Sequence, residues 1–197
     1  MDDYSQRPTR ELEHQAHVIH AGEWAIESER PLATLLGSCI AVCLFDPKLR
    51  LGGINHFMLP KMTRGANRMV DTLLAGNYAM ESLVNALLQR GARKARLQAK
   101  AFGGGSIVNV GGGQNIGQQN AEFTRGWLQR ENIPLLASDF LGPWSRKVLF
   151  QPQTGDVWCR RSATSMTTAE DIAREEAIYA AKLAERQKSA SKKIELF

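Results

Sequence analysis

The sequence predicts an α/β protein, with one layered domain of β-sheet and helix and a separate charged helix at its C-terminus. Short apolar runs typical of strands are interspersed with two segments of helical periodicity. The 197 residues suffice for one domain with a real core, and 43% hydrophobic and 23% charged residues are typical of a globular protein. Beyond residue 162 the composition changes to alanines and alternating charges, which indicates a different kind of segment.

The first part of the domain is predicted to be mostly sheet. Residues 17–26 and 32–45 have the composition of strands, the second largely buried, and residues 51–59 predict a third strand. The connection DPKLR between the last two has Asp-Pro turn chemistry, so these strands are expected to form a hairpin. Residues 63–76 are polar and contain glycine, which predicts a connection without regular structure.

The second part of the domain alternates helices with strands. Apolar residues at i, i+3, i+4, i+7 and i+8 predict a helix over 78–90, and alternating residues over 95–102 predict a half-buried strand. The elements expected after them are a glycine-rich loop over 103–113, a helix over 116–130, a strand over 133–139 and a hairpin of 146–151 with 156–161.

The two ends of the chain are expected to lie outside the main domain. Residues 1–16 are assigned as an N-terminal extension, 17–161 as the domain and 162–197 as a charged helical tail. Thr167 and Glu170 match a capping box at the start of that helix. Its apolar stripe is weak, which favours a solvated appendage.

Composition excludes several classes of protein. The polar start MDDYSQRPTRELEHQ is no signal peptide, the apolar run 35–45 is too short to span a membrane, and three cysteines form no disulfide framework. We therefore expect a cytoplasmic protein with reduced thiols. The net charge of +5 favours a solvated basic face that could steer an acidic partner, without a nucleic-acid motif. The basic clusters are Arg90/Arg93/Lys94/Arg96, Arg146/Lys147 and Arg160/Arg161.

The stretch TLLGSCIAVCLFD places Cys39 and Cys43 four residues apart. A thiol needs a base to become a thiolate near neutral pH, and His56 on the next strand of the hairpin could lie within reach of Cys39. The backbone N–H groups of Gly37–Cys39 would then lie close enough to stabilise an oxyanion. Spacing alone leaves open that Cys39 is core filler. Cys43 and Cys159 are predicted to be structural.

Other candidate sites are weaker. A zinc site from Cys39, Cys43, His56 and Cys159 is disfavoured because the cysteine pair lies within an apolar strand. FGGGSIVNVGGG lacks the Lys-Ser/Thr of a phosphate-binding loop, which favours tight turns or backbone approach to the active site. His14, His17 and His20 repeat every three residues and would not converge on a strand.

Six stretches, taken in order, resemble the chemoreceptor glutamine deamidase family CheD: HVIHAGEWAI, TLLGSCIAVCLFD, GGINHFMLP, AKAFGGGS, NIGQQN and LGPWSRKVLF. The resemblance covers about residues 17–161. It implies a single-domain α/β/β layered sandwich that hydrolyses glutamine side-chain amides on methyl-accepting chemotaxis receptors.

Matched residue by residue, the resemblance implies a catalytic set. The family's nucleophile falls on Cys39, its histidine on His56 and its threonine on Thr34, while Gln119 stands where the family pattern has arginine. No cofactor, metal or membrane insertion is implied. Besides the receptors, a CheC-type phosphatase is an implied partner, and a mainly regulatory, non-catalytic role beside it is the alternative. Hydrolysis of receptor esters is a second enzymatic alternative.

Overall fold

The computed structural model describes residues 7–59, 66–106, 116–163 and 166–194. Within these ranges the helices are α1 (Arg7–Gln15), α2 (Ala66–Gln89), α3 (Ile116–Arg130) and α4 (Met166–Ile194), with a short 3-10 turn at Lys94–Arg96. The strands are β1 (His17–Val18), β2 (Trp24–Glu27), β3 (Leu32–Leu36), β4 (Ile40–Asp46), β5 (Leu51–Phe57), β6 (Gln98–Gly103), β7 (Leu135–Phe140), β8 (Trp144–Gln151) and β9 (Asp156–Ala163).

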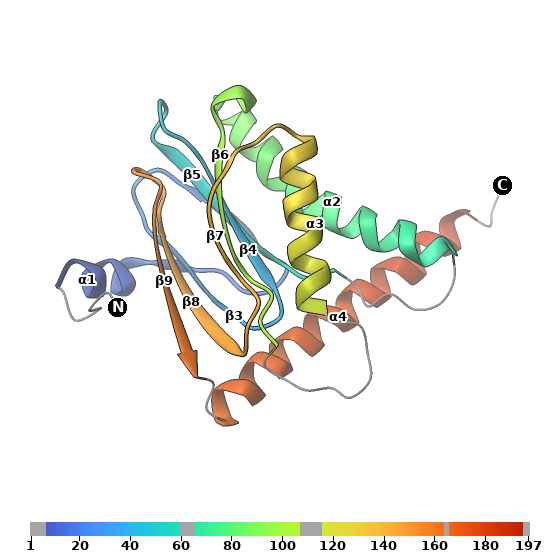
Figure 1. The fold of residues 1–197 in the computed structure, drawn as a ribbon. Coiled ribbons are helices and arrows are strands. Elements are labelled where there is room, and N and C mark those ends of the chain that lie inside the picture. The colour runs from blue at the N-terminus through green and yellow to red at the C-terminus, as the bar shows by residue number, and fades with distance from the viewer. Residues whose placement is uncertain (1–6, 60–65, 107–115, 164–165, 195–197) are drawn as a thin grey trace.

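The described elements form three layers (Figure 1). Strands in the order β2-β5-β4-β6-β7 make a five-stranded sheet, and strands in the order β1-β3-β8-β9 make a four-stranded one. One core lies between α2, α3 and the five-stranded sheet, and a second core lies between the two sheets. The predicted α/β/β sandwich with a C-terminal helix is therefore confirmed.

Strand β4 lies at the centre of the molecule and is buried throughout. The even-numbered residues from Ile40 to Leu44 pack beneath the helices, whereas the odd-numbered residues from Ala41 to Phe45 pack against the other sheet. A strand covered on both faces has no side that faces solvent, which explains why apolar residues run continuously along it. The predicted hairpin with β5 is confirmed, with Asp46 opposite Leu51 at its turn.

Two predicted strands are each broken between the sheets. Residues 32–45 are not one strand, because the bend at Gly37–Cys39 separates β3 of one sheet from β4 of the other. Residues 17–26 likewise divide into β1 and β2, which belong to different sheets. Gly37 and Cys39 are buried and Ser38 is half-buried, so apolar residues stand on both sides of a short bend with no exposed loop, which hides the break from pattern analysis.

The connection predicted for residues 63–76 is also wrong where the structure describes it. Helix α2 begins at Ala66, twelve residues before the predicted start at Tyr78. Gly76 lies inside the helix and is buried, and a Cβ there would come within 2.5 Å of the Phe123 ring on α3. This glycine therefore permits close helix packing instead of forming a turn.

The chain ends contact the domain. Leu12 of α1 packs beside Ala33 and Leu149, and on α4 Ile172 and Leu183 are only 5% and 8% exposed. Helix α4 was predicted, but it is not a solvated appendage. The division of the chain at residues 16 and 161 stays a prediction. No helix in the described part of the chain is long and apolar enough to cross a membrane.

Candidate active site

Two carbonyl groups of the bend that carries Cys39 accept hydrogen bonds from other segments of the domain. The N–H of Gly105 donates to Gly37 O at 2.8 Å, and Asn120 Nδ2 donates to Ser38 O at 2.9 Å. The C=O and N–H of a trans peptide point to opposite sides. These two bonds therefore turn the N–H groups of Ser38 and Cys39 the other way, away from Gly105 and Asn120.

Both of those N–H groups point at one acceptor. The backbone N–H groups of Ser38 and Cys39 donate to the same carboxylate oxygen, Oε1 of Glu176, at 2.7 and 3.2 Å. The Ser38 hydroxyl donates to the other oxygen, Oε2, at 2.7 Å. Two backbone donors that converge beside a buried thiol have the arrangement of an oxyanion hole.

The glycines of AKAFGGGS support this bend. Gly103 has φ +121°, and a Cβ there would lie 2.1 Å from Cys39 O, so no other residue fits without moving the bend. The N–H of Gly104 donates to the same Cys39 O at 2.8 Å. The prediction that this glycine-rich segment lets backbone approach the site is confirmed for Gly103–Gly105. The rest of the predicted loop, from residue 107 on, lies outside the described residues.

His56 is fixed in one orientation by Thr34. The Thr34 hydroxyl donates its only proton to Ile19 O at 2.8 Å. The 2.8 Å contact between Thr34 Oγ1 and His56 Nδ1 is then a bond in which the ring N–H donates to the hydroxyl oxygen. The proton therefore sits on Nδ1, and Nε2 carries the lone pair. His56 Nε2 is buried and has no hydrogen-bond partner among the described residues.

Strand register brings His56 toward Cys39. His56 on β5 lies opposite Ala41 on β4. Cys39 precedes Ala41 by two residues and packs in the same core between the sheets. Such a diagonal pair is within reach of a histidine side chain. The structure thus gathers Cys39, His56 and Thr34 at one end of the core between the sheets.

In this arrangement neither Cys39 nor His56 is charged near neutral pH. Burial raises the pKa of the Cys39 thiol well above its usual value, and the Glu176 carboxylate raises it further. Burial lowers the pKa of His56 to about 3, with a smaller contribution from the charge of His20. The pair is therefore a neutral thiol and a neutral imidazole whose free nitrogen can accept a proton.

Sequence analysis missed three polar residues at this site. Asn120 orients the Ser38–Cys39 peptide, and its Oδ1 accepts the N–H of Leu59 at 2.8 Å. Glu176 contacts the bend, and Glu175 accepts from Ala21 N–H at 3.0 Å and contacts His20 Nδ1 at 3.1 Å. Both glutamates fall among the apolar residues Ile172, Tyr179 and Leu183 at helical spacing. That interruption is the signal that could have identified them.

The other two cysteines lie outside the bend that carries Cys39. Cys43 is fully buried within the ladder of β4. Cys159 on β9 contacts Asp139 at 3.8 Å, and burial raises the pKa of its thiol to about 12. Asp139 also pairs with Arg146 and Arg161. Arg146 is 1% exposed, so it does not belong to the predicted solvated basic face.

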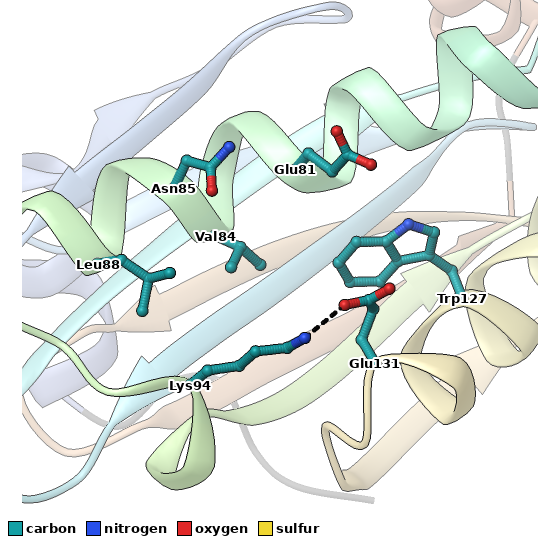
Figure 2. Close-up of a pocket in the computed structure, with 7 residues that line it drawn as sticks. All are labelled: Glu81, Val84, Asn85, Leu88, Lys94, Trp127 and Glu131. Carbon is teal, nitrogen blue, oxygen red and sulfur yellow. Dashed lines mark hydrogen bonds and ion pairs between the residues drawn. The ribbon is translucent and has the colours of Figure 1, made fainter.

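A hollow lies between α2 and α3 (Figure 2). The Lys94–Glu131 ion pair, at 2.6 Å, crosses it below the ring of Trp127. Glu81, Val84, Asn85 and Leu88 complete its lining. It lies on the helical side of the five-stranded sheet and contains none of the residues gathered around Cys39.

Comparison with known proteins gives consistent matches. The profile of the family described as CheD chemotactic sensory transduction matches residues 58–161. A Dechloromonas aromatica protein named "Probable chemoreceptor glutamine deamidase CheD 2" is 68% identical over 196 residues, which are 99% of this chain and all of that protein. A Burkholderia thailandensis protein of the same name is 44% identical over 95% of this chain and 96% of its own length. A Shewanella oneidensis "Probable chemoreceptor glutamine deamidase CheD 1" is 46% identical over 79% of this chain and 76% of its own length.

Proposed function

Because the chain belongs to the CheD family of chemotactic sensory transduction proteins, we propose that it hydrolyses glutamine side-chain amides to glutamate on methyl-accepting chemotaxis receptors. Cys39 is the nucleophile, His56 the base and Thr34 the residue that orients the histidine. The names of the relatives support the substrate, since each is called a chemoreceptor glutamine deamidase. The observation that carries the chemistry is the pair of converging N–H groups at the bend of a buried cysteine, together with a buried histidine nitrogen that has no hydrogen-bond partner among the described residues.

The first step makes an acyl-enzyme. Nε2 of His56 takes the thiol proton, and the Cys39 thiolate attacks the carboxamide carbon of the substrate. The carbonyl oxygen becomes an oxyanion, which accepts hydrogen bonds from the N–H groups of Ser38 and Cys39. Protonated His56 returns the proton to the nitrogen of the tetrahedral intermediate, the C–N bond breaks and ammonia leaves. The substrate carbon is then a thioester of Cys39.

The second step releases glutamate. His56, neutral again, takes a proton from water, whose oxygen attacks the thioester carbon. The C–S bond breaks, the carboxylic acid forms and the proton returns to the cysteine sulfur. Thr34 accepts the hydrogen bond from Nδ1–H of His56 throughout, so Nε2 performs each proton transfer. This route needs no metal or organic cofactor, and a CheC-type phosphatase partner stays a prediction.

The test compares the two buried cysteines. A receptor cytoplasmic fragment is incubated with wild-type protein, Cys39→Ala or Cys43→Ala, and conversion of glutamine to glutamate is followed by mass spectrometry. We expect the Cys39→Ala rate to fall by on the order of a thousandfold or more, since no nucleophile remains. Cys43→Ala should retain activity. Wild-type turnover by Cys39→Ala would rule out Cys39 as the nucleophile, whereas no conversion by the wild-type protein would favour a binding role or a different amide substrate.

A further inference from the structure

Helix α4 lies across the end of the sandwich at which Cys39 sits. Figure 1 shows it passing the ends of both sheets and one end of α3. Ile172 and Leu183 are buried, and Tyr179 and Ala180 pack against the core between the sheets. These residues recur at helical spacing, so one face of α4 is the packed face.

The backbone of the domain is shaped to receive this helix. Gly22 has φ +88°, and a Cβ on it would lie 2.5 Å from the Tyr179 ring. A side chain at position 22 would therefore collide with the ring. The neighbouring N–H of Ala21 donates to Glu175 at 3.0 Å, so the same turn also holds the helix by a polar contact.

The middle of the packed face carries Glu176 into the reaction site. Its carboxylate accepts three hydrogen bonds, from the N–H groups of Ser38 and Cys39 and from the Ser38 hydroxyl. These two N–H groups are the ones that would hold the substrate oxygen. Glutamate is also the product that the proposed reaction leaves in the site. The helix thus places in the oxyanion hole a glutamate side chain, which is chemically the same as the product of the reaction.

We propose, on the basis of the proposed function, that α4 is an intramolecular product mimic: it occupies the seat of the receptor helix that carries the reacting glutamine, and Glu176 blocks Cys39 until a substrate helix displaces it. The docked state is inactive for two reasons. The seat is filled, and the negative carboxylate disfavours formation of a thiolate beside it.

The same geometry defines the substrate. A glutamine side chain on a helix in this seat would place its amide oxygen where Glu176 Oε1 now lies, on the two N–H groups of the bend. The reacting residue is therefore recognised while it is still part of a helix, and receptor helices need no local unfolding to react. An isolated unstructured peptide would lose the apolar contacts that Ile172, Tyr179 and Leu183 make.

The first test converts the mimic into a substrate. In full-length Glu176→Gln, the amide at position 176 should be hydrolysed by its own chain, and mass spectrometry of the peptide that contains this position would follow the change. The double variant Cys39→Ala/Glu176→Gln should keep the amide. The matched control is Glu185→Gln, an exposed position nine residues along the same helix, which should also keep its amide. Loss of the amide at both positions at equal rates would overturn the proposal.

The second test does not depend on deamidation. The rate at which iodoacetamide alkylates Cys39 is measured in wild type, Glu176→Ala and Glu185→Ala at one pH below the thiol pKa. Each unit by which the Cys39 pKa falls raises the thiolate fraction about tenfold. We therefore expect alkylation that is faster than wild type in Glu176→Ala, and the wild-type rate in Glu185→Ala.

The two tests separate this proposal from the proposed function. Faster alkylation together with faster hydrolysis of a receptor fragment in Glu176→Ala supports both. Unchanged alkylation and unchanged hydrolysis in Glu176→Ala, with an active wild type, overturns the blocking role and leaves the deamidase intact. Faster alkylation without hydrolysis of either the receptor or the amide in Glu176→Gln overturns the deamidase and the product mimic together.

Discussion

Cys39 and Cys43 are the two cysteines of one apolar run, and the structure gives them nearly the same surroundings. Both are fully buried, both pack in the core between the sheets and burial raises the pKa of both thiols. Their backbones differ. Cys43 sits within the ladder of β4, opposite Ile54 and Lys100, whereas Cys39 ends a bend whose N–H groups point away from any ladder.

This comparison shows that burial does not distinguish a reactive cysteine from a structural one. Within a strand paired on both sides, as β4 is, the backbone N–H groups are already hydrogen-bonded, and none is left to stabilise developing charge. At the bend between β3 and β4 the ladder stops, and contacts from Gly105 and Asn120 aim the freed N–H groups at one point. The proposed chemistry of Cys39 thus depends on the break between two sheets that the apolar pattern conceals.

The largest effect is expected from removing the base that Cys39 has and Cys43 lacks. His56→Ala should lower the deamidation rate by on the order of a thousandfold, since the thiol proton then has no acceptor in place. The rate on a receptor fragment measures this. The control is His14→Ala, which changes an exposed histidine on α1 and should keep the wild-type rate. Equal rates for the two variants would remove His56 from the mechanism.

A smaller effect should follow from loosening the bend without touching the thiol. Asn120→Ala removes the donor to Ser38 O and the acceptor for Leu59 N–H. The Ser38–Cys39 peptide is then free to rotate, and we expect kcat to fall by less than the roughly 100- to 1,000-fold that removal of one oxyanion-hole donor costs. Because buried polar groups lose partners, the free energy of unfolding should also fall, by about 1–3 kcal/mol.

A control on the same helix separates the two consequences. Thr124 lies one turn along α3, and its buried hydroxyl donates to Asn120 O at 2.7 Å. Thr124→Val removes that bond while leaving the amide contact to Ser38 in place. It should lower stability without lowering kcat. If kcat falls equally in both variants, Asn120 acts only through the stability of α3.

Much of this arrangement could be predicted from the sequence, and the failures have physical causes. Periodicity identified α3 with its bounds and both hairpins, because alternation and turn chemistry are local properties. The hairpin placed His56 within reach of Cys39, but spacing left open that Cys39 is core filler. The family resemblance was needed to assign the set of Cys39, His56 and Thr34, since the sheet crossing between Thr34 and Cys39 is set by distant contacts. Glu176 was missed because the sequence does not show which distant groups contact a carboxylate within an apolar stripe, and here those groups are the backbone N–H groups of Ser38 and Cys39.

The smallest effect on rate, with a clear effect on stability, is expected at the other end of β4. The carboxylate of Asp46 is buried at the hairpin turn, where it accepts hydrogen bonds from Arg96 and from backbone N–H groups of Lys48 and Leu49. The Arg96 hydrogen bond is the main cause that lowers the pKa of Asp46 to about 2, against the opposing effect of burial. Asp46→Asn should lower the free energy of unfolding by about 2 kcal/mol at neutral pH and leave the deamidation rate unchanged.

The pH dependence provides the sharper readout. A carboxylate whose pKa is lower in the folded state stabilises the protein above its unfolded pKa, near 4, and that stabilisation is lost as the pH falls toward 2. Denaturant unfolding between pH 5 and 2 should therefore show a steeper fall for wild type than for Asp46→Asn. Asp156→Asn, at the exposed first residue of β9, should follow wild type. A deamidation rate that falls in Asp46→Asn at neutral pH would show that the two ends of β4 are coupled, and that Cys39 and Cys43 do not lie in independent regions.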